Sequence, residues 1–122
     1  MLNTIILQGR LVADPTLRQA TENASVASFR IAVERDGGGE KKVDFIDCTA
    51  WRQTGEFVTK YFKKGQAILV KGRLESRSYG DRDGNRRTAW EVNVEKAYFA
   101  GEKKEQAPEP AYEKVEDGDL PF

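Results

Sequence analysis

The sequence contains no histidine and a single cysteine, Cys48. Without histidine, the chain lacks the commonest general base and the commonest transition-metal ligand of proteins. One cysteine excludes an internal disulfide and a cysteine-rich zinc site. Strand alternation places Cys48 on a predicted core face, where a thiol behaves as a small hydrophobe. We therefore expect no cofactor, no metal site and no enzymatic activity.

Long hydrophobic runs are also missing from the sequence. No apolar stretch approaches the ~20 residues that a membrane-spanning helix needs. The start, Met1-Leu2-Asn3-Thr4, does not have the pattern of a signal peptide. With 122 residues, the chain has room for one domain. These features predict a cytoplasmic protein.

Basic and acidic residues balance over the whole chain, with 20 of each, but they are unevenly distributed along it. Residues 102–122 hold three basic and seven acidic side chains, which leaves 17 and 13 in residues 1–101. Residues 102–116 are charged, contain two prolines and have few aliphatic side chains, so they cannot offset the entropy of ordering. The prediction is a domain at 1–101, a disordered linker at 102–116 and an acidic tip at 117–122.

Alternating hydrophobicity in residues 1–101 predicts five strands, at 3–12, 25–35, 43–52, 66–79 and 88–99. A short extended piece is expected at Leu17-Arg18, and Gly9 is expected at a bulge or a close backbone approach. Five strands with one helix between the third and the fourth is the order of the OB-fold, a Greek-key five-stranded barrel. The predicted fold class is therefore mainly β.

The predicted helix follows the third strand. Thr54 is its expected N-cap, Glu56 favours its positive end, and Gly65 is its expected stop. An apolar stripe on this helix is predicted to enter the core; its members are Phe57, Val58, Tyr61 and Phe62.

Aromatic and basic side chains recur on the outward faces of the third and fourth predicted strands. Exposed aromatic rings stack on any base, and cations neutralise phosphates. This pattern predicts base stacking by Phe45, Trp51 and Tyr79. Phosphate contacts are predicted for Arg30, Arg52, Lys71, Arg73, Arg77, Arg86 and Arg87.

Other interpretations of the same pattern remain open at this point. One is a solvated sheet face with scattered aromatics, and another is an RNA-binding OB module, because stacking ignores the sugar. A structural oligomer and a metal-dependent nuclease using Asp44, Asp47 and Glu75 are weaker alternatives. Trp90 is assigned to the core, to a subunit contact or to a ligand platform.

The acidic tip ends in an apolar Leu-Pro-Phe sequence, which a frayed end does not need. Two aspartates before it fit capture in an apolar pocket rimmed by lysine or arginine. The predicted partner-binding residues are Asp117, Asp119, Leu120, Pro121 and Phe122. Because tip and domain carry opposite charge, the tip is also expected to compete weakly with nucleic acid.

Several segments together resemble the single-stranded DNA-binding proteins of bacteria and their phages. The segments are Phe45-Ile46-Asp47-Cys48-Thr49-Ala50-Trp51-Arg52, Tyr61-Phe62-Lys63-Lys64-Gly65, Val70-Lys71-Gly72-Arg73-Leu74 and Asp117-Gly118-Asp119-Leu120-Pro121-Phe122. The resemblance implies an OB-fold that assembles as a homotetramer and wraps single-stranded DNA without sequence preference. It further implies that the tip docks replication, recombination and repair proteins, in the bacterial cytoplasm at the nucleoid or in the host cytoplasm of a phage.

The sequence departs from the family pattern in two places. Residues 36–42 form a shortened connection without the stacking tryptophan that some members carry there. The linker at 102–116 is short and charged, where other members have long glycine- or glutamine-rich linkers. These departures bear on the size of the binding site and on the reach of the tip.

Overall fold

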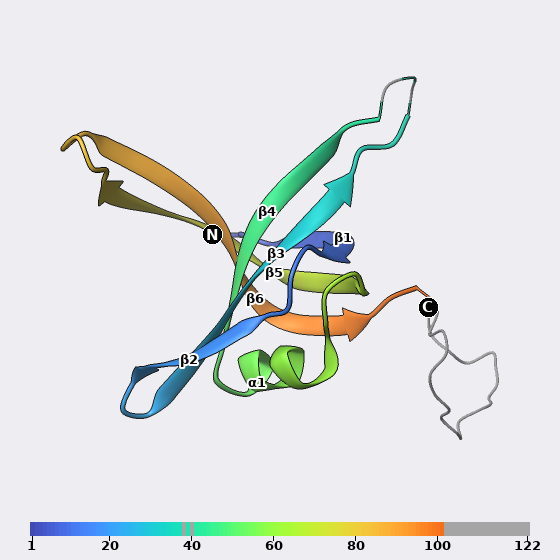
Figure 1. The fold of residues 1–122 in the computed structure, drawn as a ribbon, viewed down its shortest axis with the longest axis horizontal. Coiled ribbons are helices and arrows are strands. Elements are labelled where there is room, and N and C mark those ends of the chain that lie inside the picture. The colour runs from blue at the N-terminus through green and yellow to red at the C-terminus, as the bar shows by residue number, and fades with distance from the viewer. Residues whose placement is uncertain (38, 40, 102–122) are drawn as a thin grey trace.

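Six strands and one helix follow one another in the computed structural model, which describes residues 1–37, 39 and 41–101. Figure 1 shows one twisted sheet that wraps around a small interior, with the helix against one end. The mainly β fold with a single helix confirms the prediction. The elements are β1 (Ile5–Leu11), β2 (Thr16–Thr21), β3 (Ala24–Glu34), β4 (Val43–Trp51), α1 (Arg52–Tyr61), β5 (Ala67–Gly80) and β6 (Arg86–Phe99).

The sheet closes into a barrel through β1. Its strand order is β1-β5-β6-β4-β3-β2, and β1 also pairs with β3, where Leu11 lies opposite Ile31. β4 and β6 are parallel, and every other pairing is antiparallel. A Cβ atom at Gly9 would collide with the carbonyl oxygen of Ala32, so the expected close approach is confirmed at the closure point. This arrangement is an OB-type barrel.

β2 is longer than the sequence predicted. The expected extended piece at Leu17-Arg18 is part of a six-residue strand that pairs antiparallel with β3. All but one of its side chains are exposed, so no hydrophobic alternation marks the strand in the sequence. Hydrogen bonding to the edge of β3, and not an apolar face, therefore accounts for this sixth strand.

Alternating side chains of the barrel strands make the core, together with Val58 of α1 and Phe62, which directly follows the helix. Cys48 is 1% exposed and burial raises the pKa of its thiol to about 12, as expected for a buried cysteine. Val58 and Phe62 are fully buried, but Tyr61 lies at the rim beside Phe99 and is largely exposed, so its assignment to the core was wrong. The buried cluster consists of Leu11, Ala27, Phe29, Ile31, Cys48, Ala50, Val58, Phe62, Ile68, Val70, Val92 and Val94.

The ends of α1 differ from the prediction. The helix begins at Arg52, directly after β4, and the N-cap residue Trp51 makes no side-chain cap. Thr54 is therefore inside the first turn, where its hydroxyl donates to the carbonyl of Glu95 at 3.3 Å. Gly55 permits this abrupt start, because a Cβ atom there would collide with the carbonyl oxygen of Ala50.

The last helical residue is Tyr61, because Phe62 already has extended backbone angles. Gly65, the predicted stop, lies in the following turn at φ +86° and donates its N–H to Leu11. Glu56 lies beyond the first turn, which contains no acidic residue, so its predicted place at the positive end was also wrong.

Two hairpins project from the barrel (Figure 1). The β3–β4 hairpin extends toward residues 36–42, and the β5–β6 hairpin extends toward residues 80–86. Beyond the barrel, residues 74–80 and 86–91 pair only with each other, because β1 reaches Gly72 and β4 reaches Val92 and Asn93. We call this two-stranded projection the β5–β6 arm.

Candidate nucleic-acid interface

The predicted alternation along β4 is present in the structure. Cys48 and Ala50 point into the core, whereas Phe45 and Trp51 are 61% and 38% exposed on the opposite side. These two aromatics are six positions apart, a distance of about 20 Å along a strand. They are therefore positioned to contact different parts of an extended ligand.

A second aromatic and basic surface is formed by β5 and β6. Tyr79 is 42% exposed, and the guanidinium of Arg77 lies 5.9 Å from the centre of its ring. In the ladder, Tyr79 is opposite Arg87 and Arg73 is opposite Asn93. The aromatic and basic side chains of this surface belong to the predicted set, whereas Asn93 was not among the predicted site residues.

The surfaces of β4 and β5 join through β6. Thr49 of β4 is next to Asn93 of β6, Asn93 is opposite Arg73 of β5, and Thr49 is also opposite Ser28 of β3. A row of four side chains thus crosses four strands on the side away from the core. We call this continuous surface of β3, β4, β6 and β5 the outer face. It contains Phe45, Trp51 and Tyr79.

Carboxylates lie among the predicted cations, a feature that the sequence analysis missed. Arg30 pairs with Asp47 and Arg73 pairs with Glu75, each at 2.8 Å between nitrogen and oxygen. Glu75 also accepts a weak hydrogen bond from the side-chain amide of Asn93. The other pairs that involve predicted cations are Lys71–Glu95 at 3.6 Å, Arg73–Glu95 at 4.0 Å, Arg77–Glu91 at 3.7 Å and Arg87–Asp81 at 2.8 Å.

Five of the seven predicted cations are therefore already paired with acidic side chains. Within the part of the chain that the structure describes, Arg52 and Arg86 form no ion pair. The pairs of Arg30, Lys71 and Arg73 are exposed at both partners, and exposed pairs are worth under about 1 kcal/mol each. A phosphate group can replace a carboxylate at such an arginine with little change in free energy.

Two of these ion pairs shift the pKa of their members. Hydrogen bonding to Asp47 raises the pKa of Arg30, so this guanidinium remains charged. A hydrogen bond from Arg87 holds the pKa of Asp81 below its usual range, with further donation from the backbone of Asn85. Both groups therefore keep their charge at neutral pH.

Arg52 has an unusual backbone conformation. Its φ is +54°, the one positive value among non-glycine residues in the described ranges 1–37, 39 and 41–101. Such a conformation costs about 1–3 kcal/mol and persists only where the surroundings enforce it. Here it turns the chain from β4 straight into α1, so that a cation follows Trp51 at the end of the outer face.

The three carboxylates considered for metal-dependent cleavage do not come together. Asp44 is on the other side of β4, paired with Arg35, which lowers the pKa of Asp44. Asp47 and Glu75 each pair with an arginine on the outer face. Among the residues whose placement is described, no group of three or more acidic or cysteine side chains could hold a metal ion.

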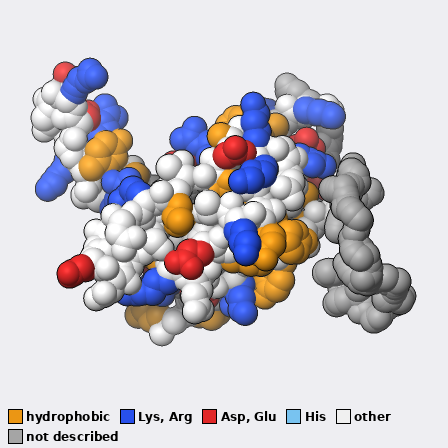
Figure 2. All heavy atoms as spheres, turned by 60° about the horizontal axis from the view of Figure 1, so that its bottom comes forward, with side chains coloured by type: hydrophobic (Ala, Val, Ile, Leu, Met, Phe, Trp, Pro, Cys, Tyr) orange, Lys and Arg blue, Asp and Glu red, His pale blue; other side chains and the backbone are white. Residues whose placement is uncertain are grey.

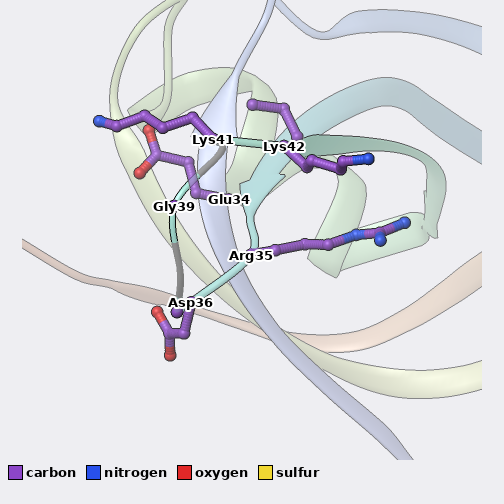
Figure 3. A pocket seen from close by; sticks show the side chains of 8 residues that line it. Glu34, Arg35, Asp36, Gly39, Lys41 and Lys42 are labelled. Carbon is purple, nitrogen blue, oxygen red and sulfur yellow. The ribbon is translucent and has the colours of Figure 1, made fainter.

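A shallow hollow lies at the turn between β3 and β4 (Figure 3). Charged side chains of both signs line it, from Glu34, Arg35, Asp36, Lys41 and Lys42. Its lining is mainly polar and charged, unlike the largely apolar clefts that bind small molecules.

The sequence pattern of the Single-strand binding protein family matches residues 2–100, which include every residue of the outer face. The chain belongs to this family. The resemblance stated from the sequence is thereby confirmed.

Curated relatives of this chain are bacterial. It is 42% identical over 102 residues to single-stranded DNA-binding protein A of Bacillus subtilis, an alignment that covers 81% of this chain and 59% of the relative. It is 41% identical over 102 residues to single-stranded DNA-binding protein 2 of Listeria monocytogenes, covering 81% and 64%. Over the full length of both chains, it is 33% identical to single-stranded DNA-binding protein 1 of Lactococcus lactis. The chain spans about three fifths of the length of the first two relatives.

The predicted linker and tip lie outside the described residues. The partner-binding role of the tip therefore remains a prediction from the sequence. It concerns Asp117, Asp119, Leu120, Pro121 and Phe122. No helix among the residues that the structure describes is long and apolar enough to cross a membrane.

Proposed function

We propose that this chain binds single-stranded DNA without sequence preference, on the outer face. The observation that carries the proposal is the continuity of this face. Two aromatics of β4 and one of β5 lie on one surface, with arginines between them, in a member of the Single-strand binding protein family. The rings of Phe45, Trp51 and Tyr79 receive the bases, and the arginines receive the phosphates.

The aromatic contacts supply most of the proposed binding free energy. Each stacked base is worth ~1–3 kcal/mol and tolerates any base, because every base has a π-face. An exposed arginine that exchanges Asp47 or Glu75 for a phosphate gains much less, under about 1 kcal/mol. Because stacking supplies most of the free energy, binding is expected to be independent of base sequence. The cations mainly orient the DNA backbone.

Tryptophan fluorescence during titration with oligo-dT tests the proposal, with matched duplex DNA and matched RNA as competitors. We expect quenching by the single strand, weaker binding at higher salt and poor competition by duplex. Alanine at Phe45, Trp51 or Tyr79 should each weaken binding roughly 5- to 150-fold. Tyr61→Leu, which alters an exposed aromatic on α1, is the matched control and should bind normally. Equal binding of duplex would refute the proposal, and preferred binding of RNA would replace it with an RNA-binding function.

We further propose that the protein assembles as a homotetramer. Support comes from exposed apolar side chains on β1, β5 and β6, away from the three aromatics. Ile6 is 60% exposed, and it lies in the same part of the sheet as Leu69 and the exposed Tyr98. Sedimentation equilibrium should give about 55 kDa, four times the chain mass of 13.7 kDa. Ile6→Glu should lower this mass, and a monomeric wild-type protein would contradict the proposal.

The acidic tip is proposed to recruit proteins of DNA replication, recombination and repair, in the cytoplasm where bacterial chromosomes lie. Support comes from its sequence, in which two aspartates precede Leu120-Pro121-Phe122. Binding of purified replication and repair proteins should be lost when residues 117–122 are deleted, with binding of oligo-dT retained. Undiminished partner binding by the deletion variant would contradict a role for the tip.

A further inference from the structure

Trp90 lies on the side of the β5–β6 arm that faces away from the outer face. It is opposite Ser76 in the ladder, whereas the adjacent Glu91 is opposite Glu75, which belongs to the outer face. Successive residues of a strand point to opposite sides, so Trp90 and Tyr79 occupy different sides of the arm. Trp90 is 59% exposed, more than Trp51 or Tyr79, which excludes its assignment to the core of the protomer.

Within residues 74–80 and 86–91, the positions on the same side of the arm as Trp90 are mostly polar and include no acidic side chain. Alternate positions on the same side of the two arm strands are exposed Ser76, Ser78, Thr88 and Arg86. Arg77 and Arg87, on the outer side of the arm, pair with Glu91 and Asp81. Arg86, in contrast, forms no ion pair with any residue that the structure describes.

This composition suits a nucleic acid better than a second protein chain. A protein interface places several apolar side chains around its aromatic anchors. Leu74 is the one large apolar neighbour of Trp90 among the exposed arm positions on this side. Hydroxyl groups and an unneutralised cation around one exposed ring are instead the features that bind phosphates and stack a base.

The arm is thin, and its edges are open beyond Leu74, whose backbone is hydrogen-bonded to the Asn3 side chain. Residues 74–80 and 86–91 pair only with each other, so no neighbouring strand covers either edge. A single sheet layer with its side chains is about 10 Å thick. Single-stranded DNA that leaves Tyr79 can therefore pass around an edge of the arm and reach Trp90. Figure 2 shows hydrophobic, basic and acidic side chains on this projecting part of the molecule.

We propose that Trp90 is a second base-stacking position, with Arg86 as its phosphate contact. A long single strand occupies the outer face and then continues around the arm. This inference rests on the proposed function, since it extends the path of the same ligand. DNA binding on the outer face alone does not involve Trp90, so the inference gives this residue a separate role.

The two tryptophans allow each position to be observed separately. Trp51→Phe leaves Trp90 as the one fluorescent tryptophan, and Trp90→Phe leaves Trp51. With long oligo-dT, we expect quenching in both variants. Quenching of Trp51 with unchanged emission from Trp90 would overturn the inference and leave the proposed function intact. Absence of quenching and of binding in both variants would instead refute the proposed function.

Affinity measured over a series of oligo-dT lengths gives an independent test. Trp90→Ala should weaken binding of long strands roughly 5- to 150-fold and leave the shortest bound strands unaffected. Arg86→Gln should reduce the salt slope by about 0.7, the value for one phosphate contact of a single strand. Lys60→Gln on α1 removes a cation distant from the arm and should leave the slope unchanged.

A subunit contact at Trp90 makes different predictions. In that case, Trp90 would be shielded from iodide quenching before DNA is added, and Trp90→Ala would lower the mass in sedimentation equilibrium. Either result would overturn the assignment of Trp90 to DNA. An unchanged mass together with a length-dependent loss of affinity supports it.

Discussion

Replacement of Glu75 by glutamine is expected to strengthen DNA binding, because it removes a negative charge from the outer face. Glu75 holds Arg73 at 2.8 Å and lies directly opposite Glu91 in the ladder. Like charges at opposite positions destabilise a sheet. The substitution removes the nearer of the two carboxylates that pair with Arg73, leaving Glu95 at 4.0 Å, and relieves this repulsion, so neither DNA binding nor folding should suffer.

The magnitude follows from the ion pairs. An exposed ion pair is worth ~0.2–1 kcal/mol. In the wild type, a phosphate must displace Glu75 from Arg73, so removal of this pair should tighten DNA binding about 1.4- to 5-fold at low salt. Seven phosphate contacts with full counterion release would give a salt slope of about 5, and the two unpaired cations alone would give about 1.4. Five of the seven predicted cations are paired, so we expect a wild-type slope per protomer well below 5. Glu75→Gln should steepen it by up to about 0.7.

Fluorescence titration with oligo-dT at several salt concentrations measures both quantities. Glu22→Gln is the control, since Glu22 lies in the turn between β2 and β3 and forms no ion pair with the described residues. Thermal unfolding should show that Glu75→Gln is at least as stable as wild type. Weaker binding by a stably folded Glu75→Gln, or a slope equal to that of wild type, would refute the idea that carboxylates compete with phosphates.

Three further predictions concern the fold. Gly72→Ala should lower the free energy of unfolding, measured in urea, by ~1–3 kcal/mol, because its Cβ atom would collide with the carbonyl oxygen of Asn93. Gly80→Ala is the control, since the space around Gly80 is open. Equal urea midpoints for the two variants would contradict the geometry. The Cys48 thiol, with a pKa of about 12, should resist iodoacetamide near pH 8 until the protein unfolds, and rapid labelling of native protein would contradict its burial. Arg87 lowers the pKa of Asp81, so this stabilisation is present above the ordinary aspartate pKa of ~3.9 and is lost as pH falls through the lower folded value. The difference in stability between wild type and Asp81→Asn should therefore shrink in acid, and parallel pH profiles would contradict it.

Local pattern was a reliable guide where one side of an element is buried. Burial of Cys48 and Ala50 and exposure of Phe45 and Trp51 follow from alternation along a single strand. The same reasoning could not find β2, whose side chains are exposed on both sides. It also placed the helix start at a capping residue, whereas contact between Gly55 and the end of β4 sets the start at Arg52.

One ion pair of the outer face could have been predicted from the sequence. Arg73 and Glu75 are two residues apart, so they must share a side of β5, and they form an ion pair. The pairing of Arg77 with Glu91 was not readable, because it depends on the register of two strands joined by a turn.

The sequence by itself determined which side chains share a side of each strand, because the strand period of two is a local property. It also determined the class of the fold, through the order of strands and helix. The tertiary structure alone decided that β6 lies between β4 and β5, so that Phe45, Trp51 and Tyr79 occupy one surface. It likewise decided that Trp90 lies beyond the barrel on the projecting arm, where its side chain is 59% exposed. Strand order and register arise from barrel closure between distant segments, and no local pattern encodes that contact.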